Sequence, residues 1–157
     1  LRADHDDLTG LLNRKAFWEQ AHAVLEASEG DATVVLADFD RFKEMNDNHG
    51  HAMGDRALEA FGAVCENVLG TDDRAGRLGG DEFVFVLAHG GRERADKIVR
   101  DVAQAFADAK AESAVWPTIT FGVASLGQQG LDAALVEADK ALYQAKGTGR
   151  HRSSIRR

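Results

Sequence analysis

The chain has 157 residues, of which 44% are hydrophobic and 29% are charged, a composition typical of a folded soluble domain and not of a disordered chain. Its formal net charge of -7 argues against binding a nucleic-acid polymer, which requires clustered lysine and arginine, but it is compatible with binding a single nucleotide. No apolar run approaches the roughly 20 residues of a membrane span, so no membrane contact is expected.

The N-terminus shows neither a starting methionine nor a signal peptide, so we expect a piece of a longer protein that lacks its preceding segments. The single cysteine, Cys65, cannot form an internal disulfide, which fits a cytoplasmic location, although missing segments would allow a membrane anchor in the full-length protein. The helical spacing of Cys65 with Leu58 and Phe61 predicts a small buried hydrophobe rather than a nucleophile.

The first half of the chain predicts two helices and a strand. After a turn-rich segment at 7–14, apolar spacing predicts a helix over 14–27, and the nearly continuous apolar run 33–38 predicts a central strand covered on both faces. The polar stretch 39–55 is assigned no helix or strand. A long helix is predicted to begin at about residue 55 and to run to residue 69.

The second half predicts a hairpin and a further helix, strand and helix. In chain order these are strands 74–78 and 83–87, a helix over 93–109, a strand over 118–124 and a helix over 131–146. The order predicts an α+β fold with a central, mostly antiparallel sheet flanked by helices, of the ferredoxin-like, nucleotide-cyclase or polymerase-palm type. Because no linker or repeat is evident, we expect a single domain over 1–157.

The hairpin carries two glycines followed by two acids, Gly79-Gly80-Asp81-Glu82. Such a turn holds both carboxylates forward with little side-chain bulk, although an ordinary hairpin turn would also explain this short sequence. Asp38 ends the predicted central strand, where a solvated acid is the alternative to a ligand. If that strand lies beside the hairpin, Asp38 and Asp81 converge and form a minimal Mg²⁺ site for phosphate chemistry.

Two further segments carry residues suited to a nucleotide. Asn46 and Asp55 can pair with the donors of a guanine base, although Asp55 also suits the N-cap of the helix predicted from that position, and the two roles do not exclude each other. Lys43 suits a phosphate or is simply a surface lysine. Lys146 and Arg150 flank a glycine-rich turn at a helix end, where the alternatives are a phosphate clamp and compensation of the helix dipole.

Together these segments resemble the GGDEF domain of bacterial diguanylate cyclases. The match is carried, in the family's order, by residues 6–14, 38–55, 79–83 and 138–146 with Gly149 and Arg150. The resemblance implies that two GTP condense into cyclic di-GMP with release of two pyrophosphates, by Mg²⁺-assisted attack of a 3′-hydroxyl on an α-phosphate. It also implies a homodimer in which each domain holds one GTP, controlled by an upstream sensory domain.

The resemblance assigns the metal and catalytic roles to the strand end and the turn. Asp38, Asp81 and the backbone carbonyl of Phe39 would hold Mg²⁺, with Mn²⁺ as an alternative. Asp81 would also help to deprotonate the attacking hydroxyl, and Glu82 would support the metal and phosphate region. Lys43 would contact the phosphates in the transition state.

The resemblance assigns the substrate contacts to five residues. Asn46 and Asp55 would recognise guanine, and His51 would neighbour the nucleotide. Lys146 and Arg150 would bind the phosphates.

One family feature is degenerate in this chain. Many members have an Arg-x-x-Asp motif at which the product binds and inhibits, whereas here Gly70 replaces the arginine and only Asp73 is retained. Loss of the bidentate guanidinium predicts weak or absent product inhibition. The alternative functions are a GTP-binding regulatory domain without strong catalysis and a palm-type nucleotide enzyme of different specificity.

Overall fold

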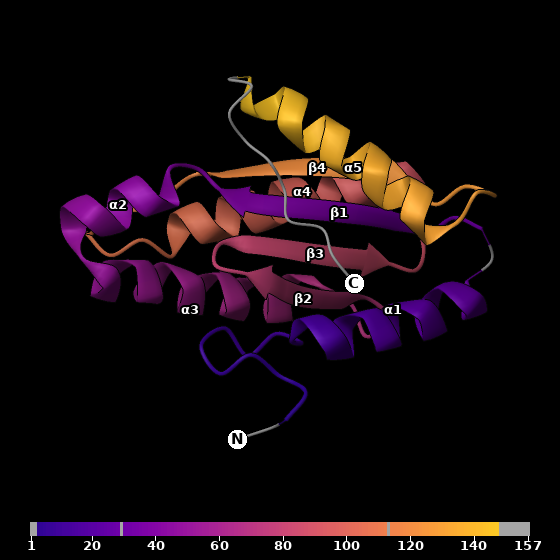
Figure 1. Ribbon diagram of the computed structural model, residues 1–157, viewed down its shortest axis with the longest axis horizontal. Helices are drawn as coiled ribbons and strands as arrows, with labels where there is room; N and C mark the ends of the chain where they lie inside the picture. The colour runs from indigo at the N-terminus through magenta and orange to yellow at the C-terminus, as the bar shows by residue number, and fades with distance from the viewer. Residues whose placement is uncertain (1–2, 29, 113, 148–157) are drawn as a thin grey trace.

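A computed structural model describes residues 3–28, 30–112 and 114–147, which form a sheet with helices on both faces (Figure 1). The strands are β1 (Thr33–Phe39), β2 (Arg74–Gly79), β3 (Glu82–Leu87) and β4 (Ile119–Ser125). Their order in the sheet is β2-β3-β1-β4, and every neighbouring pair is antiparallel. This arrangement confirms the predicted α+β fold with an antiparallel sheet.

The described residues form five helices, which flank the sheet. They are α1 (Arg14–Ala27), α2 (Phe42–His49), α3 (His51–Val68), α4 (Gly91–Asp108) and α5 (Leu131–Lys146). None of the helices in these ranges combines the length and the apolar character needed to cross a membrane.

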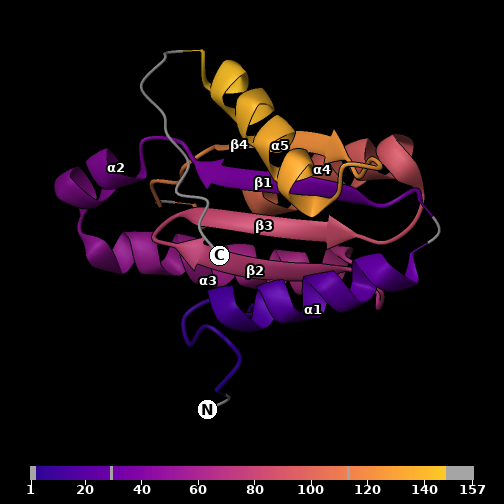
Figure 2. The ribbon, with the colours of Figure 1, turned by 45° about the vertical axis from the view of Figure 1, so that its right-hand side comes forward.

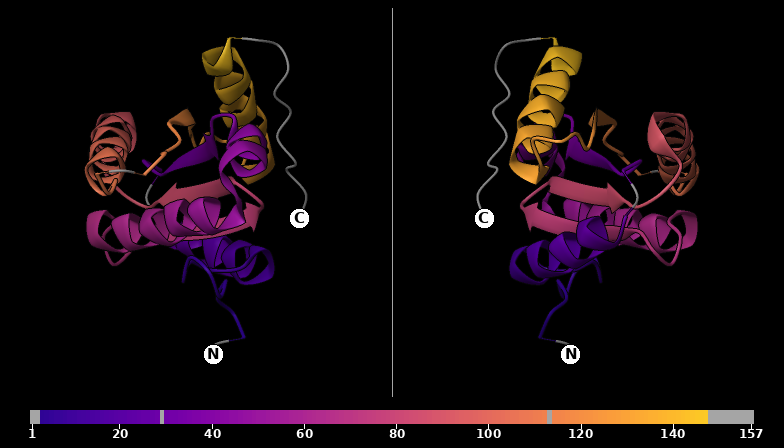
Figure 3. Two further views of the ribbon diagram at one scale, coloured as in Figure 1. Left: turned by 90° about the vertical axis from the view of Figure 1, so that its left-hand side faces the viewer. Right: turned by 90° about the vertical axis from the view of Figure 1, so that its right-hand side faces the viewer.

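Two apolar cores lie on opposite faces of the sheet. The helices α3 and α4 cover one face, and α1 and α5 cover the other (Figure 3). Because successive strand residues point to opposite faces, Val35 and Phe39 of β1 enter the first core while Val34 and Leu36 enter the second. The same alternation places Asp38 on the face covered by α5, which determines what it can contact.

The stretch 39–55 differs from the prediction because it contains α2 and the first turn of α3. Arg41 adopts a left-handed conformation with φ of 53° immediately before α2, and Gly50 separates the two helices with φ of 90°. Within α2 only Met45 is buried, so the helix leaves almost no apolar periodicity in the sequence. Since α3 begins at His51, the predicted capping role of Asp55 is wrong.

Cys65 lies in α3 with no exposed surface, as predicted. Burial raises the pKa of its thiol far above the ordinary value, so the reactive thiolate is not available at neutral pH. Cys65 therefore acts as a core residue between the sheet and α3.

Candidate functional site

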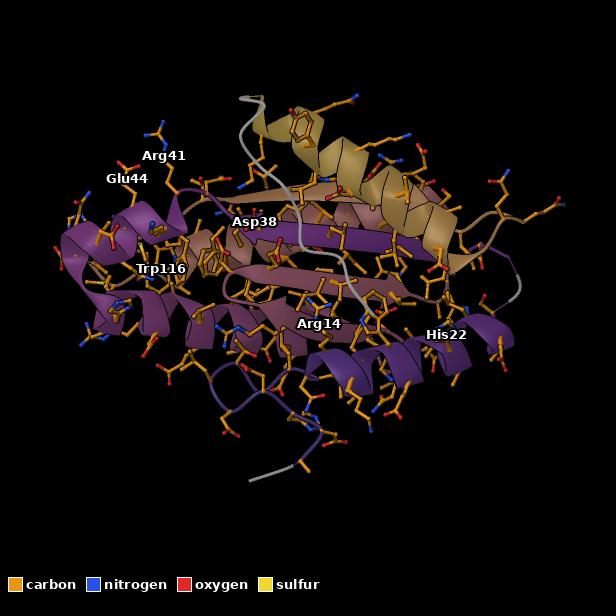
Figure 4. The ribbon with its side chains drawn as sticks, viewed as in Figure 1. Arg14, His22, Asp38, Arg41, Glu44 and Trp116 are labelled. Atoms are coloured by element: carbon orange, nitrogen blue, oxygen red, sulfur yellow. The ribbon has the colours of Figure 1, made fainter. Side chains whose placement is uncertain are left out.

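Asp38 and Asp81 meet at one end of the sheet. Asp38 is the penultimate residue of β1, is 4% exposed and lies opposite Glu82 of β3. Asp81 lies in the two-residue turn between β2 and β3, and its carbonyl accepts a 3.2 Å hydrogen bond from the Phe39 amide. Figure 4 shows Asp38 at the end of β1 beside α2, with Arg41 directed away from the sheet. The hydrogen bond between Phe39 and Asp81 thus connects the end of β1 to the turn between β2 and β3.

Two arginines, Arg77 of β2 and Arg14 of α1, support this turn. Arg77 donates to the carbonyl of Gly80 through Nε at 3.0 Å and through Nη2 at 2.7 Å. Its Nη1 atom lies 3.2 Å from both carboxylate oxygens of Asp6, and Arg14 donates to the Leu78 carbonyl at 3.2 Å. These bonds hold the backbone on both sides of Gly79, so cations outside the cavity help to fix the turn that carries Asp81.

The two site carboxylates are close enough to share a proton. Burial, repulsion by Asp38 and a hydrogen bond that the protonated Asp81 donates to that carboxylate together raise the pKa of Asp81 to about 7. Burial also raises the pKa of Asp38, although Lys146 partly opposes the shift. A pair of this kind holds either a proton or a cation between its oxygens near neutral pH.

This pairing predicts that the metal-free protein becomes less stable as the pH rises. Between about pH 4 and pH 7 the folded state binds more protons at Asp81 than the unfolded chain, so its free energy of unfolding falls through this window. The pKa values of Asp6 and Asp40 are lowered, so these groups change the free energy of unfolding only below about pH 4 and do not offset this loss of stability. After allowance for solvent screening, we expect a loss on the order of 2 kcal/mol.

Urea unfolding in EDTA at pH 5 and pH 8 measures this loss. Asp81→Asn is expected to remove most of the difference between the two pH values, because the amide does not titrate. Parallel pH profiles for the wild type and the variant would contradict the raised pKa.

Lys146, at the end of α5, lies against these carboxylates and is 12% exposed. Its Nζ atom is 3.3 Å from Asp38 Oδ2 and donates to the Phe39 carbonyl at 3.3 Å. It also donates to Asp40 Oδ1 at 2.7 Å. The lysine therefore does more than compensate the helix dipole.

The oxygen atoms around Lys146 fit a hard divalent cation. The ammonium group stands among oxygens of Asp38 and Phe39, and the Asp81 carboxyl group completes the set. Mg²⁺ prefers such oxygen donors and binds through one or two carboxylates, with phosphates and water at its other positions. Within the described ranges, no group of three or more His, Cys, Asp or Glu side chains is arranged as a metal site.

A polar cavity of about 760 Å³ opens beside these groups, between the end of β1, α2 and the end of α5. This volume is within the range of small-molecule sites. It brings together five of the predicted site residues, which are Asp38, Phe39, Lys43, Asp81 and Lys146. The other predicted residues that the structure describes, Glu82, Asn46, His51 and Asp55, do not line it. Arg150 lies outside the described residues.

Asn46 and Asp55 belong to the adjoining helices α2 and α3. The Asn46 Oδ1 atom is buried and has no hydrogen-bond partner among the described residues. Gly54 of α3 allows the close approach, because a Cβ atom at this position would lie 2.0 Å from that oxygen. His51 and Asp55 are exposed one turn apart on α3. This region offers an unused acceptor next to an exposed carboxylate.

Asp73 is the residue retained from the product-inhibition motif, and its carboxylate is hydrogen-bonded to other residues of this chain. Its side chain is 1% exposed and forms a bidentate pair with Arg94, at 3.0 Å to Nη1 and 2.6 Å to Nη2. The amide of Gly70 donates to the same carboxylate at 2.7 Å, and that of Ala88 at 3.4 Å. The carboxylate is therefore occupied by structural bonds that join the segment before β2 to the residue after β3 and to α4.

Asp73→Ala is expected to lower the free energy of unfolding by about 3 kcal/mol, because Arg94 and two backbone amides lose their acceptor. Urea unfolding measures the change. Asp72→Ala is the matched control, since Asp72 is exposed and pairs only with exposed His89 among the contacts described. Equal stability of the two variants would show that Asp73 has no structural role.

Several residues that support the site were not predicted from the sequence. Asp40 bonds Thr118, Thr120 and Lys146, and Arg77 holds the glycine turn. A signal was present for Asp40, because it repeats Asp38 at a spacing of two and so shares its face of the strand. For Arg77 the only signal was its place two residues before the glycine pair.

Comparisons with known proteins match almost the whole chain. A family model described as "Diguanylate cyclase, GGDEF domain" matches residues 3–152. Diguanylate cyclase DgcM of Escherichia coli is 34% identical over 154 residues, which are 96% of this chain and 38% of that protein. The chain thus spans well under half the length of this relative.

Two solved structures are similar in fold. The GGDEF domain of DgcB from Caulobacter crescentus, solved in complex with c-di-GMP, has a TM-score of 0.81 and 29% identity, covering 96% of this chain and 91% of that one. Diguanylate cyclase SiaD from Pseudomonas aeruginosa, solved with its activator SiaC, has a TM-score of 0.83 and 29% identity, covering 94% and 59%. These neighbours have the nucleotide-cyclase palm fold, as predicted for this chain.

Proposed function

This chain belongs to the diguanylate cyclase GGDEF domain family, and from this premise we propose that it condenses two GTP into cyclic di-GMP and releases two pyrophosphates. One observation carries the proposal. The carboxyl groups of Asp38 and Asp81 converge with the Phe39 carbonyl and the Lys146 ammonium at one polar cavity. Phosphoryl transfer requires mainly positioning and charge neutralisation, which these groups supply.

Asp38, Asp81 and the Phe39 carbonyl are the groups that would hold Mg²⁺, or Mn²⁺ in its place. When bound, the ion would neutralise charge on the α-phosphate and on the leaving pyrophosphate. Glu82, opposite Asp38 in the strand register, adds negative charge next to these ligands. It would support the metal and phosphate region without lining the cavity.

The chain's own residues then orient the reactants. The 3′-hydroxyl oxygen of one GTP attacks the α-phosphorus of the other, the bond from that phosphorus to pyrophosphate breaks, and Asp81 accepts the hydroxyl proton. A second, equivalent step closes the ring. Lys43 and Lys146, which both line the cavity, would balance the phosphate charge, and Arg150 would add a further cation.

Guanine recognition is assigned to the region between α2 and α3. The unpartnered Oδ1 atom of Asn46 is an acceptor for the N–H groups of the base, and exposed Asp55 accepts as well. His51, one turn before Asp55, would neighbour the nucleotide. This chemistry favours guanine, whose Watson–Crick edge carries two adjacent donors, over adenine.

Gly54→Ala is expected to weaken binding of 3′-deoxy-GTP by about tenfold, because the new methyl group displaces the Asn46 amide. Isothermal titration calorimetry measures the affinity, with 3′-deoxy-ATP showing whether discrimination between the bases falls as well. Asn46→Ala is the matched background, in which Gly54→Ala is expected to add little loss of affinity. A tenfold loss in both backgrounds would contradict the role of Asn46.

Catalysis requires two such domains, since each would hold one GTP. We therefore propose a homodimer as the active species. The proposal also includes a cytoplasmic location, and control by sensory segments of a longer protein, of which this chain is one domain.

The test is incubation of the purified protein with GTP and Mg²⁺, followed by chromatographic separation of the nucleotides. Cyclic di-GMP is expected, with a specific activity that rises with protein concentration as the dimer forms. GTP binding without product at every protein concentration would instead identify a regulatory GTP-binding domain.

A further inference from the structure

Asp40 lies just beyond the end of β1, and its carboxylate is held in one orientation. The hydroxyl groups of Thr118 and Thr120 donate to Oδ2 and Oδ1 at 2.5 and 2.6 Å. The Asp40 amide donates to the Thr118 carbonyl at 2.9 Å, which fixes the backbone as well. Asp40 is thus an acceptor whose side chain and backbone are both fixed.

The contact of Lys146 with Asp40 is shorter than its other two contacts with site oxygens. Lys146 Nζ lies 2.7 Å from Asp40 Oδ1 and 3.3 Å from both Asp38 Oδ2 and the Phe39 carbonyl. The latter two oxygens are those proposed to hold Mg²⁺. A divalent ion there would repel the ammonium group, so the bond to Asp40 is the one that persists when Asp38 and Phe39 are engaged.

We propose that Asp40, fixed by Thr118 and Thr120, is a positioning residue that holds the Lys146 ammonium beside the metal site, where it reaches the phosphates of GTP. The inference rests on the proposed function, because it takes Lys146 to be a phosphate ligand. It assigns a role to Asp40, a cavity-lining residue to which the proposed function gives no part as metal ligand or substrate contact.

This arrangement lowers the entropic cost of binding. A lysine side chain has four rotatable bonds, and ordering it when the nucleotide arrives would weaken the complex. Here Lys146 is already 12% exposed and directed into the cavity. The hydrogen bonds from the two threonine hydroxyls restrict rotation of the Asp40 carboxylate, so Lys146 is bonded to an acceptor that is itself ordered.

The test measures binding of 3′-deoxy-GTP with Mg²⁺ by isothermal titration calorimetry, since this nucleotide lacks the attacking hydroxyl and is not consumed. Asp40→Asn and Lys146→Met are each expected to weaken binding by about tenfold. The double variant is expected to bind within about twofold of Lys146→Met, because the two residues act as one unit. Additive losses would overturn the proposal and indicate a general structural role for Asp40.

If Asp40→Asn does not fold, substitutions of the two threonines test the positioning role of Asp40 instead. Thr118→Val and Thr120→Val together preserve the strand shape and remove only the donors to Asp40. They are expected to weaken binding by about threefold in the wild-type background and to have no effect in the Lys146→Met background. Equal effects in both backgrounds would overturn the positioning role.

A control and a comparison separate this inference from the proposed function. Glu137→Gln removes one negative charge from an exposed site on α5 and is expected to bind like the wild type. Wild-type binding by Asp40→Asn, when Lys146→Met is weakened, overturns the positioning role alone. Failure of the wild type itself to bind 3′-deoxy-GTP overturns the proposed function and this inference with it.

Discussion

Asp81→Asn is expected to lower formation of cyclic di-GMP by about 10³-fold or more while the protein remains folded. The amide cannot accept the hydroxyl proton and is a poor replacement for a charged metal ligand. The fold is expected to survive because the turn is held by backbone groups. The Asp81 carbonyl, not its side chain, accepts from Phe39, and Arg77 holds the Gly80 carbonyl.

The activity assay with GTP and Mg²⁺ measures the loss, and urea unfolding shows that the variant is folded. Glu82→Gln is an informative comparison, because this residue lies opposite Asp38 but does not line the cavity. A loss of only about tenfold is expected for it, as for a group that supports the ligands indirectly. Equal losses in the two variants, or activity retained by Asp81→Asn, would contradict the separate roles proposed for the two acids.

Much of the fold follows from local sequence patterns. The continuous apolar run 33–38 predicted a strand covered on both faces, and β1 does lie between β3 and β4. The glycine pair before alternating apolar residues predicted the hairpin of β2 and β3. These signals are strong because burial on two faces and a tight turn each restrict the residue types that are tolerated.

The segment after β1 was not predictable in the same way. Its helix α2 is polar and buries only Met45, and the left-handed residue before it is Arg41, where glycine or asparagine would have been the expected signal. Asp55 is a good capping residue by type, but Gly50 breaks the chain earlier and the helix starts at His51. Capping preferences are weak beside the packing of α2 against α3.

Within the site, too, some contacts could be predicted from the sequence and others could not. The meeting of Asp38 with Asp81 could be anticipated because both lie at strand ends of one predicted sheet. The contact between Asp40 and Lys146 could not, because it depends on how closely α5 approaches the sheet (Figure 2). Gly122 of β4 permits this close approach. A Cβ atom there would lie 2.1 Å from the Ala138 carbonyl and 2.6 Å from the Leu142 amide.

Gly122→Ala is therefore expected to lower the free energy of unfolding by about 3 kcal/mol, because backbone atoms of α5 cannot move aside without lifting the helix from the sheet. Lys146 lies one turn beyond Leu142, so the lifted helix is also expected to carry its ammonium group away from Asp38 and Asp40 and to weaken binding of 3′-deoxy-GTP by about tenfold.

Urea unfolding and calorimetry measure the two effects. Gly127→Ala is the matched control, because a Cβ atom at this position in the connection between β4 and α5 meets nothing within 4 Å. It is expected to change the stability by less than about 0.5 kcal/mol and to leave binding unchanged. If Gly122→Ala is destabilised but binds 3′-deoxy-GTP normally, the position of the Lys146 ammonium group does not depend on how closely α5 packs on the sheet. If the two glycine variants are equally stable, the close approach of α5 to β4 is not a determinant of the fold.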